Sequence, residues 1–418
     1  MASFNGDVKK AKLAIKKGAD VNGAYKSPIE SKTKENKIYV GYSAGSPPIA
    51  IATGEGHLAI VKLLIANKVK INKPSKKGST ALMVACGNNR LEIAKLLIEN
   101  KIKINQEVEC SDCPDNGTTA IFKAVQAGNL EIVKLLIANK AKLDGFPKTK
   151  SSPLLVASRK GNLEIVKYLL KKKAILDIKG EDGVTPLMFA AISTNLDLIK
   201  FLINKKVNVN AAQNDGYTAL TYAIEDGNLE IVKLLIENKA DVNINPIPKD
   251  SLTTLLIAIN RYYLEIVKLL LEKKVDVNLA NGENITPLMM ATTMENIEIV
   301  KILLDYKADC NLKGDEGVYP LLIAVESGNL EIAKILLDKN ADVNLKDERG
   351  NTALITATNE GRTEIVKLLL EKKADATIAN NNKETAYDIA KKNGNKEILE
   401  LYKSAEATKT IAPEKITP

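Results

Sequence analysis

Short apolar segments alternate with polar ones in a fixed order along the chain. Residues 183–190 read Gly-Val-Thr-Pro-Leu-Met-Phe-Ala, and Leu187 and Ala190 share one face of a helix because they lie three positions apart. Residues 227–235 read Gly-Asn-Leu-Glu-Ile-Val-Lys-Leu-Leu, and their apolar positions form more than one stripe on a helix. A helix of the second kind needs cover on two sides. The pattern therefore predicts short helices that stack against neighbours.

Both segments recur along the chain. The first segment has counterparts at 216–223, 284–291, 317–324 and 350–357, and the second at 128–136, 161–169 and 328–336. The alanines that close the first segment are Ala52, Ala85, Ala124, Ala157, Ala190, Ala223, Ala258, Ala291, Ala324, Ala357 and Ala390. Eight of their ten intervals are 33 residues, and the other two are 39 and 35. A period of this length predicts an array of structural repeats.

Each repeat carries signals that begin and end two helices. Thr185 is placed to cap the first helix, and Pro186 follows where a missing N–H costs nothing. Gly227 suits a left-handed helix end, and Asn228 can cap the helix that follows it. Lys239, after the last turn of that helix, matches the helix dipole. The repeat is predicted to be a helix, a tight turn, a second helix and an extended finger.

These residues resemble the ankyrin repeat, a 33-residue unit of a β-turn and two antiparallel helices. The resemblance rests on Thr185-Pro186-Leu187, on Ala190, on 227–235 and on Ala240-Asp241-Val242-Asn243. It implies an all-α ankyrin-repeat solenoid of helix-turn-helix units with β-turn fingers. We expect a single ankyrin-repeat domain over residues 1–402 and a C-terminal tail at 403–418. Its expected parts are a partial N-terminal cap at 1–22, an insertion at 23–45 and about eleven units at 46–402.

The sequence departs from the family at one repeated position. Ankyrin repeats commonly place His after Thr-Pro-Leu. Here that position holds Met83, Phe122, Leu155, Met188, Thr221, Leu256, Met289, Leu322 and Ile355. We expect apolar packing to replace the polar network that the histidine supports in the family.

The resemblance implies a non-catalytic scaffold that binds a protein partner through its concave face and finger loops. One expected contact position is the residue before the motif threonine, which is apolar in five successive units: Val184, Tyr217, Leu252, Ile285 and Val318. Residue pairs before the helix-turn glycine supply further contacts, among them Arg159 with Lys160, and Arg261 beside Tyr262. An aromatic residue next to a cation is typical of binding hot spots.

Each of these interpretations has a structural alternative. β-branched residues favour an extended finger whether or not it binds anything. One of the tyrosines at 262 and 263 could pack within the fold instead of facing a partner. The whole chain could be a structural spacer whose activity lies in a missing segment or in a partner.

The net charge of +9, from 60 Lys and Arg against 51 Asp and Glu, first suggests an anionic ligand. Only five of the cations are Arg, the residue that phosphate and base recognition favours. Most lysines follow helix ends. We therefore expect no nucleic-acid partner and, with no long apolar run, no membrane partner. The protein is expected to be a monomer.

The chain offers little for catalysis. Gly41-Tyr42-Ser43-Ala44-Gly45 matches the nucleophile elbow of hydrolases, but His57 is the single histidine in 418 residues. That histidine also occupies the turn position that asparagine fills in other repeats, so capping explains it. No phosphate-binding loop or zinc-protease motif occurs. We expect no enzyme activity, no metal and no cofactor.

Two cysteines, Cys110 and Cys113, lie in a six-residue insertion. The C-x-x-C pair could be a local disulfide, two plain thiols, half of a zinc site or a redox pair. Cys86 and Cys310 are interpreted as small core or finger residues. The N-terminus lacks the features of a signal peptide, so the cytoplasm is the default location. A disulfide at Cys110–Cys113 with a removed signal would instead indicate the periplasm or secretion.

The largest insertion adds about 17 residues within 23–45. It contains Tyr25, Tyr39 and Tyr42 among several lysines. Insertions in repeat proteins go to loops on one face, often the binding face. A partner-contacting flap and a surface loop without function are both consistent with this composition.

Overall fold

The computed structural model describes residues 6–23, 31–32, 37–38, 45–109, 116–144, 151–244 and 252–410, with side chains up to 404. The chain falls into two compact units, Met1–Gln213 and Asn214–Pro418, here called unit 1 and unit 2. Both are built from pairs of short helices, which confirms the all-α repeat solenoid expected from the sequence. The single domain over residues 1–402 stays a prediction.

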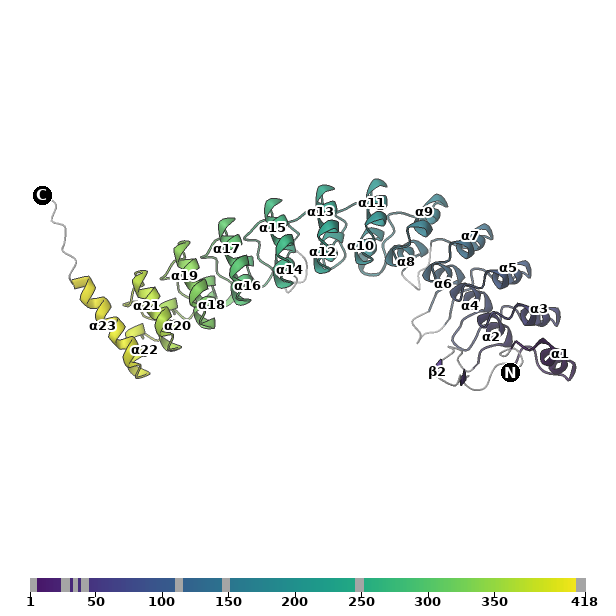
Figure 1. Cartoon of the computed structure of the whole chain (residues 1–418), viewed down its shortest axis with the longest axis horizontal. Coiled ribbons are helices and arrows are strands. Elements are labelled where there is room, and N and C mark those ends of the chain that lie inside the picture. The colour runs from purple at the N-terminus through teal and green to yellow at the C-terminus, as the bar shows by residue number, and fades with distance from the viewer. Residues whose placement is uncertain are drawn as a thin grey trace. The chain divides into compact units, whose positions relative to one another are not determined.

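Unit 1 contains two rows of helices (Figure 1). The first helices of its repeats are α2 (Pro48–Gly54), α4 (Ala81–Gly87), α6 (Ala120–Gln126), α8 (Pro153–Arg159) and α10 (Pro186–Ile192). The second helices are α1 (Val8–Lys16), α3 (Leu58–Ala66), α5 (Leu91–Glu99), α7 (Leu130–Ala138), α9 (Leu163–Lys171) and α11 (Leu196–Asn204). A 3₁₀ turn, η1 (Glu181–Gly183), lies in one finger. The position of α1 against α3 fits a truncated first repeat.

Unit 2 repeats the arrangement. Its first helices are α12 (Ala219–Glu225), α14 (Thr254–Asn260), α16 (Pro287–Thr293), α18 (Pro320–Ser327), α20 (Ala353–Asn359) and α22 (Ala386–Lys392). Its second helices are α13 (Leu229–Glu237), α15 (Leu264–Glu272), α17 (Ile297–Asp305), α19 (Leu330–Asp338), α21 (Thr363–Glu371) and α23 (Lys396–Thr410). A finger turn is η2 (Asp315–Gly317). None of the helices described in the two units is long and apolar enough to cross a membrane.

The first helices begin where the sequence predicts. The Thr185 hydroxyl accepts the N–H of Met188 at 3.3 Å, so it satisfies a donor that the helix start leaves free. The same cap is made by Thr80, Ser152, Thr218, Thr253, Thr286, Thr352 and Thr385. Tyr319 occupies this position in one repeat. Its ring is fully buried and its hydroxyl donates to the Leu345 carbonyl at 2.7 Å.

Most of the second helices are capped by asparagine, although those after Arg90, Tyr263 and Arg362 lack a side-chain cap. Oδ1 of Asn228 accepts the N–H of Ile231 at 3.1 Å, and Gly227 before it has the predicted left-handed conformation with φ +74°. The expectation that His57 caps in the same way is wrong. The His57 side chain does not make the capping bond to α3, and its ring lies against Gly6, where a Cβ would come within 2.8 Å of Cε1. The ring thus fills space beside the N-terminal segment.

The second residue after most second helices is held in the left-handed region. Lys239 has φ +68°, and the same conformation occurs at Lys68, Lys101, Lys140, Lys173, Lys206, Lys274, Lys307, Asn340 and Lys373. Lysine there closes the helix and keeps its charge near the negative end of the helix dipole. The sequence predicts the charge effect at this position, but not the backbone conformation.

The position that holds His in the family is more polar here than expected. Sδ of Met188 lies 3.3 Å from the backbone nitrogen of Thr185, and Met83 makes the same contact with Thr80 at 3.4 Å. Thr221 replaces the histidine with two hydroxyl hydrogen bonds to the backbone of its cap residue. Apolar packing alone is therefore the wrong description for these three repeats, whereas Leu155 and Leu256 at the same position are buried in the apolar core as expected. Sulfur and hydroxyl acceptors still satisfy the cap N–H in these repeats.

The core is aliphatic and continuous from repeat to repeat within each unit. Neighbouring first helices pack more closely than neighbouring second helices. Fully buried alanines such as Ala85 and Ala124 allow this close approach. The first helices and their fingers therefore form the concave side of each unit. Each repeat covers the apolar stripes of its neighbour, as the two-stripe pattern requires.

An asparagine ties each finger to the following repeat. Oδ1 of Asn278 accepts the N–H of Asp309 at 2.9 Å, and Asp309 accepts the N–H of Asn311 at 2.8 Å. In unit 1 the same bond joins Asn72 to Lys103 at 2.7 Å. The Asp-x-Asn pattern thus has two physical roles, because its first residue shapes the turn and its last links repeats.

The insertion at 23–45 contains an antiparallel strand pair, β1 (Ser31–Lys32) and β2 (Lys37–Ile38). Ser31 pairs with Ile38. Tyr25, Tyr39 and Tyr42 lie outside the described residues.

Candidate functional site

The structure brings finger and first-helix positions together at one point in unit 2. The Tyr217 hydroxyl donates to Oε1 of Glu225 at 3.2 Å, and its ring lies 5.7 Å from that of Tyr222. Burial, followed by the Glu225 carboxylate, raises the pKa of Tyr217 to about 12. Finger and concave helix therefore form one continuous surface in this repeat.

The residues before the motif threonine offer less apolar surface than their sequence suggests. Val184, in unit 1, is only 9% exposed. In unit 2, Tyr217, Leu252, Ile285 and Val318 are half-buried. Much of the surface of each side chain is covered by the rest of the protein. A partner could reach their edges but not a broad apolar strip.

The charged pair on α8 is exposed. Arg159 and Lys160 both point to solvent, and the Arg159 guanidinium lies 5.8 Å from the ring centre of Phe189 on the next first helix. Phe189 is half-buried, and Ile192, one turn later on α10, is 41% exposed. This face of unit 1 combines two cations with apolar side chains.

The cluster at the end of α14 divides into two roles. Arg261 is exposed, and Tyr262 is 56% exposed with φ +59° at the turn position that is glycine in most repeats. Tyr263 instead packs on Gly227, where a Cβ would come within 2.6 Å of its ring. The alternative of a structural tyrosine is confirmed for Tyr263. Tyr262 and Arg261 face solvent.

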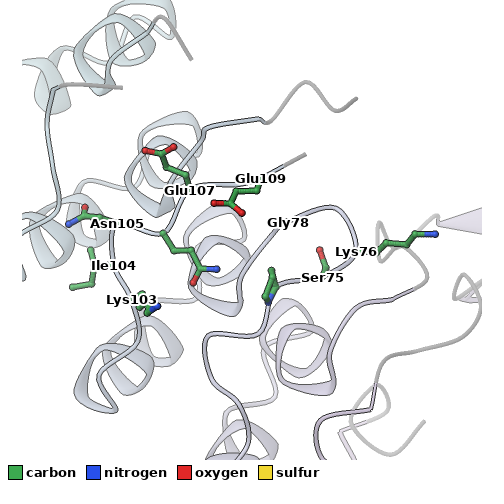
Figure 2. A pocket seen from close by; sticks show the side chains of 10 residues that line it. Ser75, Lys76, Gly78, Lys103, Ile104, Asn105, Glu107 and Glu109 are labelled. Atoms are coloured by element: carbon green, nitrogen blue, oxygen red, sulfur yellow. The ribbon is translucent and has the colours of Figure 1, made fainter. Parts of the chain in front are cut away.

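Two neighbouring fingers of unit 1 enclose a pocket of about 710 Å³. Figure 2 shows Ser75 and Gly78 on one finger, with Glu107 and Glu109 on the other. The Lys76 side chain points away from this group (Figure 2). The pocket is wide and polar, and its charges are mixed.

A second hollow, missed by the sequence reasoning, lies on the concave side of unit 2. Fingers and first helices of three successive repeats, those of α18, α20 and α22, enclose a groove of about 370 Å³. We call it the acidic groove, because its lining carries five carboxylates, those of Glu316, Glu326, Asp347, Glu360 and Glu384. Arg349 and Lys392 are the cations of its lining.

The two units differ in the sign of their net charge, which the total of +9 for the whole chain does not show. Residues 1–213 contain 35 Lys and Arg against 18 Asp and Glu, a net charge of +17. Residues 214–418 contain 25 against 33, a net charge of −8. One repeated position, the residue two before the linking asparagine, follows this trend. It is Lys70 and Lys103 in two repeats of unit 1, although Asp20 holds it in the truncated first repeat, and it is Asp276, Asp309 and Asp342 in unit 2.

The described residues contain no group of three or more His, Cys, Asp or Glu placed to hold a metal ion. Cys86 and Cys310 are buried, as interpreted from the sequence, and burial raises the pKa of both thiols. Cys110 and Cys113 lie outside the described residues, as do Gly41 to Ala44 of the elbow-like motif.

Comparison with protein families gives matches along most of the chain. A family model described as ankyrin repeats (3 copies) matches residues 1–108, 105–180, 173–246, 247–314 and 321–411. A second model, described as ankyrin repeats (many copies), matches residues 293–337. A comparison with curated proteins gives no significant match.

Proposed function

The chain belongs to the ankyrin-repeat family, whose repeats are general protein–protein interaction modules, and on that premise we propose that it is a non-catalytic scaffold that binds a protein partner. Recognition takes place on the concave side and fingers of each unit. In unit 1 the proposed contact residues are Arg159, Lys160 and Val184. In unit 2 they are Tyr217, Leu252, Arg261, Tyr262, Ile285 and Val318.

The observation that carries the proposal is the conformation of Tyr262. Its position has φ +59°, a region that a bulky side chain adopts at a cost of about 1 kcal/mol. Glycine fills the same turn position at Gly56, Gly128, Gly161, Gly227, Gly328, Gly361 and Gly394. The ring is exposed, so it adds little packing energy in return. An exposed tyrosine beside Arg261 is suited to anchoring a partner.

Substitution of Tyr262 by Gly tests the proposal without damage to the fold. Glycine relieves the left-handed strain, so the variant should be as stable as the parent or more stable by up to about 1 kcal/mol. Affinity capture from the source organism should lose a bound protein when Tyr262→Gly replaces the parent chain as bait.

A matched control is Thr194→Gly, which relieves the same strain at φ +55° in unit 1 and removes an exposed side chain outside the proposed contacts. This control should retain every captured protein. If Tyr262→Gly and a second variant, Arg159→Ala with Lys160→Ala, both retain all of them, the proposal of recognition through these surfaces is wrong. A spacer role would then be the better description.

A further inference from the structure

The acidic groove of unit 2 combines an aliphatic floor with a rim of carboxylates. Leu322, Ile355 and Ile389 lie in its lining with almost no exposed surface, and Val318 is half-buried beside them. Glu326 on α18 and Glu360, which directly follows α20, are exposed at the ends of neighbouring first helices. The lining therefore offers apolar contact at Val318 and negative charge around it.

The charges of the groove are only partly compensated from within. Nζ of Lys392 pairs with Oε1 of Glu384 at 3.0 Å. Arg349 reaches Glu316 only at 3.9 Å, and both side chains are more than three-quarters exposed, so this pair contributes little. Glu326, Asp347 and Glu360 make no ion pair with any residue that the structure describes.

The pKa of Glu326 reflects its partial burial and this excess of negative charge in the groove. Although much of the side chain is exposed, the groove walls exclude part of its water, and this desolvation is the main cause that raises the pKa of Glu326. The carboxylates of Asp347 and Glu360 raise it further, while Arg349 opposes the change. A cation placed among these three carboxylates would relieve the repulsion.

We propose that the acidic groove binds a lysine or arginine side chain from an extended basic segment of the protein partner. This inference rests on the proposed function and specifies the chemistry of the partner. The alkyl stem of such a side chain packs on the accessible edge of Val318, while its charged head meets Glu326 and Glu360. A compact metal ion fits less well, because the described residues form no metal-holding group. Nucleic acid is repelled by the same carboxylates.

The charge of the whole unit favours the same partner. Unit 2 has a net charge of −8, so a basic segment is attracted before it makes contact. The spacing of the helices also fits an extended peptide. First helices of successive repeats lie about 10 Å apart, which is three residues of extended chain, so basic residues at intervals of about three would meet successive repeats.

The test uses the full chain and a fluorescein-labelled peptide of about nine residues that repeats Arg-Gly-Gly, so that its basic residues are three positions apart. Its binding is measured by fluorescence anisotropy in about 50 mM NaCl, where surface charge is weakly screened. A peptide of the same length that repeats Glu-Gly-Gly should not bind. Glu326→Gln with Glu360→Gln should weaken binding of the basic peptide about tenfold, because two contacting charges are removed.

The matched control removes two carboxylates from the second helices instead. Glu331 on α19 and Glu364 on α21 are exposed, and their double replacement by Gln changes the net charge of unit 2 equally. Its effect should be less than about twofold. Equal losses in both variants would mean general charge attraction and would overturn the proposal, as would unchanged binding by the groove variant. Thermal unfolding of both variants confirms that they are folded.

Two further results separate this inference from the proposed function. If the groove variant retains every protein that Tyr262→Gly loses, and also retains the basic peptide, the proposed function stands and the groove assignment is wrong. Self-association of the parent chain in analytical ultracentrifugation, lost in the groove variant, would also overturn the assignment. The occupant would then be a second copy, whose unit 1 is strongly basic.

Discussion

The two units use the same helix end for different interactions. Some second helices in both units have lysine as the C-cap residue, but in unit 1 Lys172 and Lys205 lie over the rings of Tyr168 and Phe201 on their own helices, at 5.7 and 5.5 Å. In unit 2, Lys339 pairs with Asp305 of the preceding repeat at 2.8 Å. At these helix ends Lys172 and Lys205 of unit 1 contact aromatic rings, whereas Lys339 and Lys372 of unit 2 pair with carboxylates.

This contrast shows which positions the fold determines and which it leaves free. Caps, buried leucines and linking asparagines are alike in the two units because each satisfies a donor or fills the core. Exposed finger turns differ instead, because Lys70 and Lys103 in unit 1 stand where unit 2 has Asp276 and Asp309, at little cost to the fold. Surface charge can therefore diverge between repeats of one architecture, and it supplies the difference in partner preference proposed here.

The largest effects should come from the core, where the units do not differ. Leu154 in α8 and Leu321 in α18 occupy the same repeat position and are fully buried. Each Leu→Ala substitution should lower the free energy of unfolding by about 3 kcal/mol through lost burial and a new cavity. Urea denaturation measures the change, and hydrogen exchange locates it. Because repeats contact only their neighbours, exchange should rise most in the substituted unit.

An equal rise of exchange in both units from either substitution would contradict that locality. It would instead indicate that residues 1–402 unfold as the single domain that the repeat pattern predicts. Glu364→Gln, on the exposed face of α21, serves as the control and should change neither unit.

Local chemistry made most of the fold predictable from the sequence. Thr185 and Asn228 could be assigned as caps because each satisfies backbone groups within three residues. The His57 prediction failed because the residue meets Gly6, fifty-one positions away, in a contact that no repeat pattern encodes. The acidic groove was missed for the same reason. Glu326 and Glu360 lie one repeat apart, and a total charge of +9 conceals an acidic unit.

Substitution of Tyr319, which lies in unit 2, should have an intermediate effect on the free energy of unfolding. It replaces the capping threonine, and its buried hydroxyl donates to the Leu345 carbonyl at 2.7 Å. Tyr319→Phe keeps the ring but removes the donor to the Leu345 carbonyl, so the free energy of unfolding should fall by about 1–2 kcal/mol. Urea denaturation at neutral pH measures it. Tyr387→Phe, on an exposed tyrosine of α22, is the control, and equal effects would show that the hydrogen bond contributes nothing.

Substituting lysine for aspartate at the finger turn of unit 2, and aspartate for lysine in unit 1, should change the free energy of unfolding of the two units differently. Asp276 accepts the N–H of Asn278 at 2.9 Å, a bond that Lys103 at the same position in unit 1 cannot make. Asp276→Lys should therefore lower the free energy of unfolding by about 1 kcal/mol. Lys103→Asp should leave it unchanged or raise it slightly. A loss from the second substitution as large as from the first would mean that unit 1 depends on its lysines for stability.

The smallest effects should come from the helix-end lysines themselves. A double-mutant cycle on Lys372 and Asp338, which pair at 2.5 Å on the surface of unit 2, should give a coupling of about 0.5 kcal/mol. The coupling should fall toward zero in about 1 M NaCl because exposed ion pairs are screened. The matching cycle on Lys205 and Phe201 in unit 1 should give a similar value that salt reduces less, since packing of the lysine stem on the ring contributes. If salt abolishes both couplings equally, the two units stabilise this helix end in the same way, and their difference is confined to net charge.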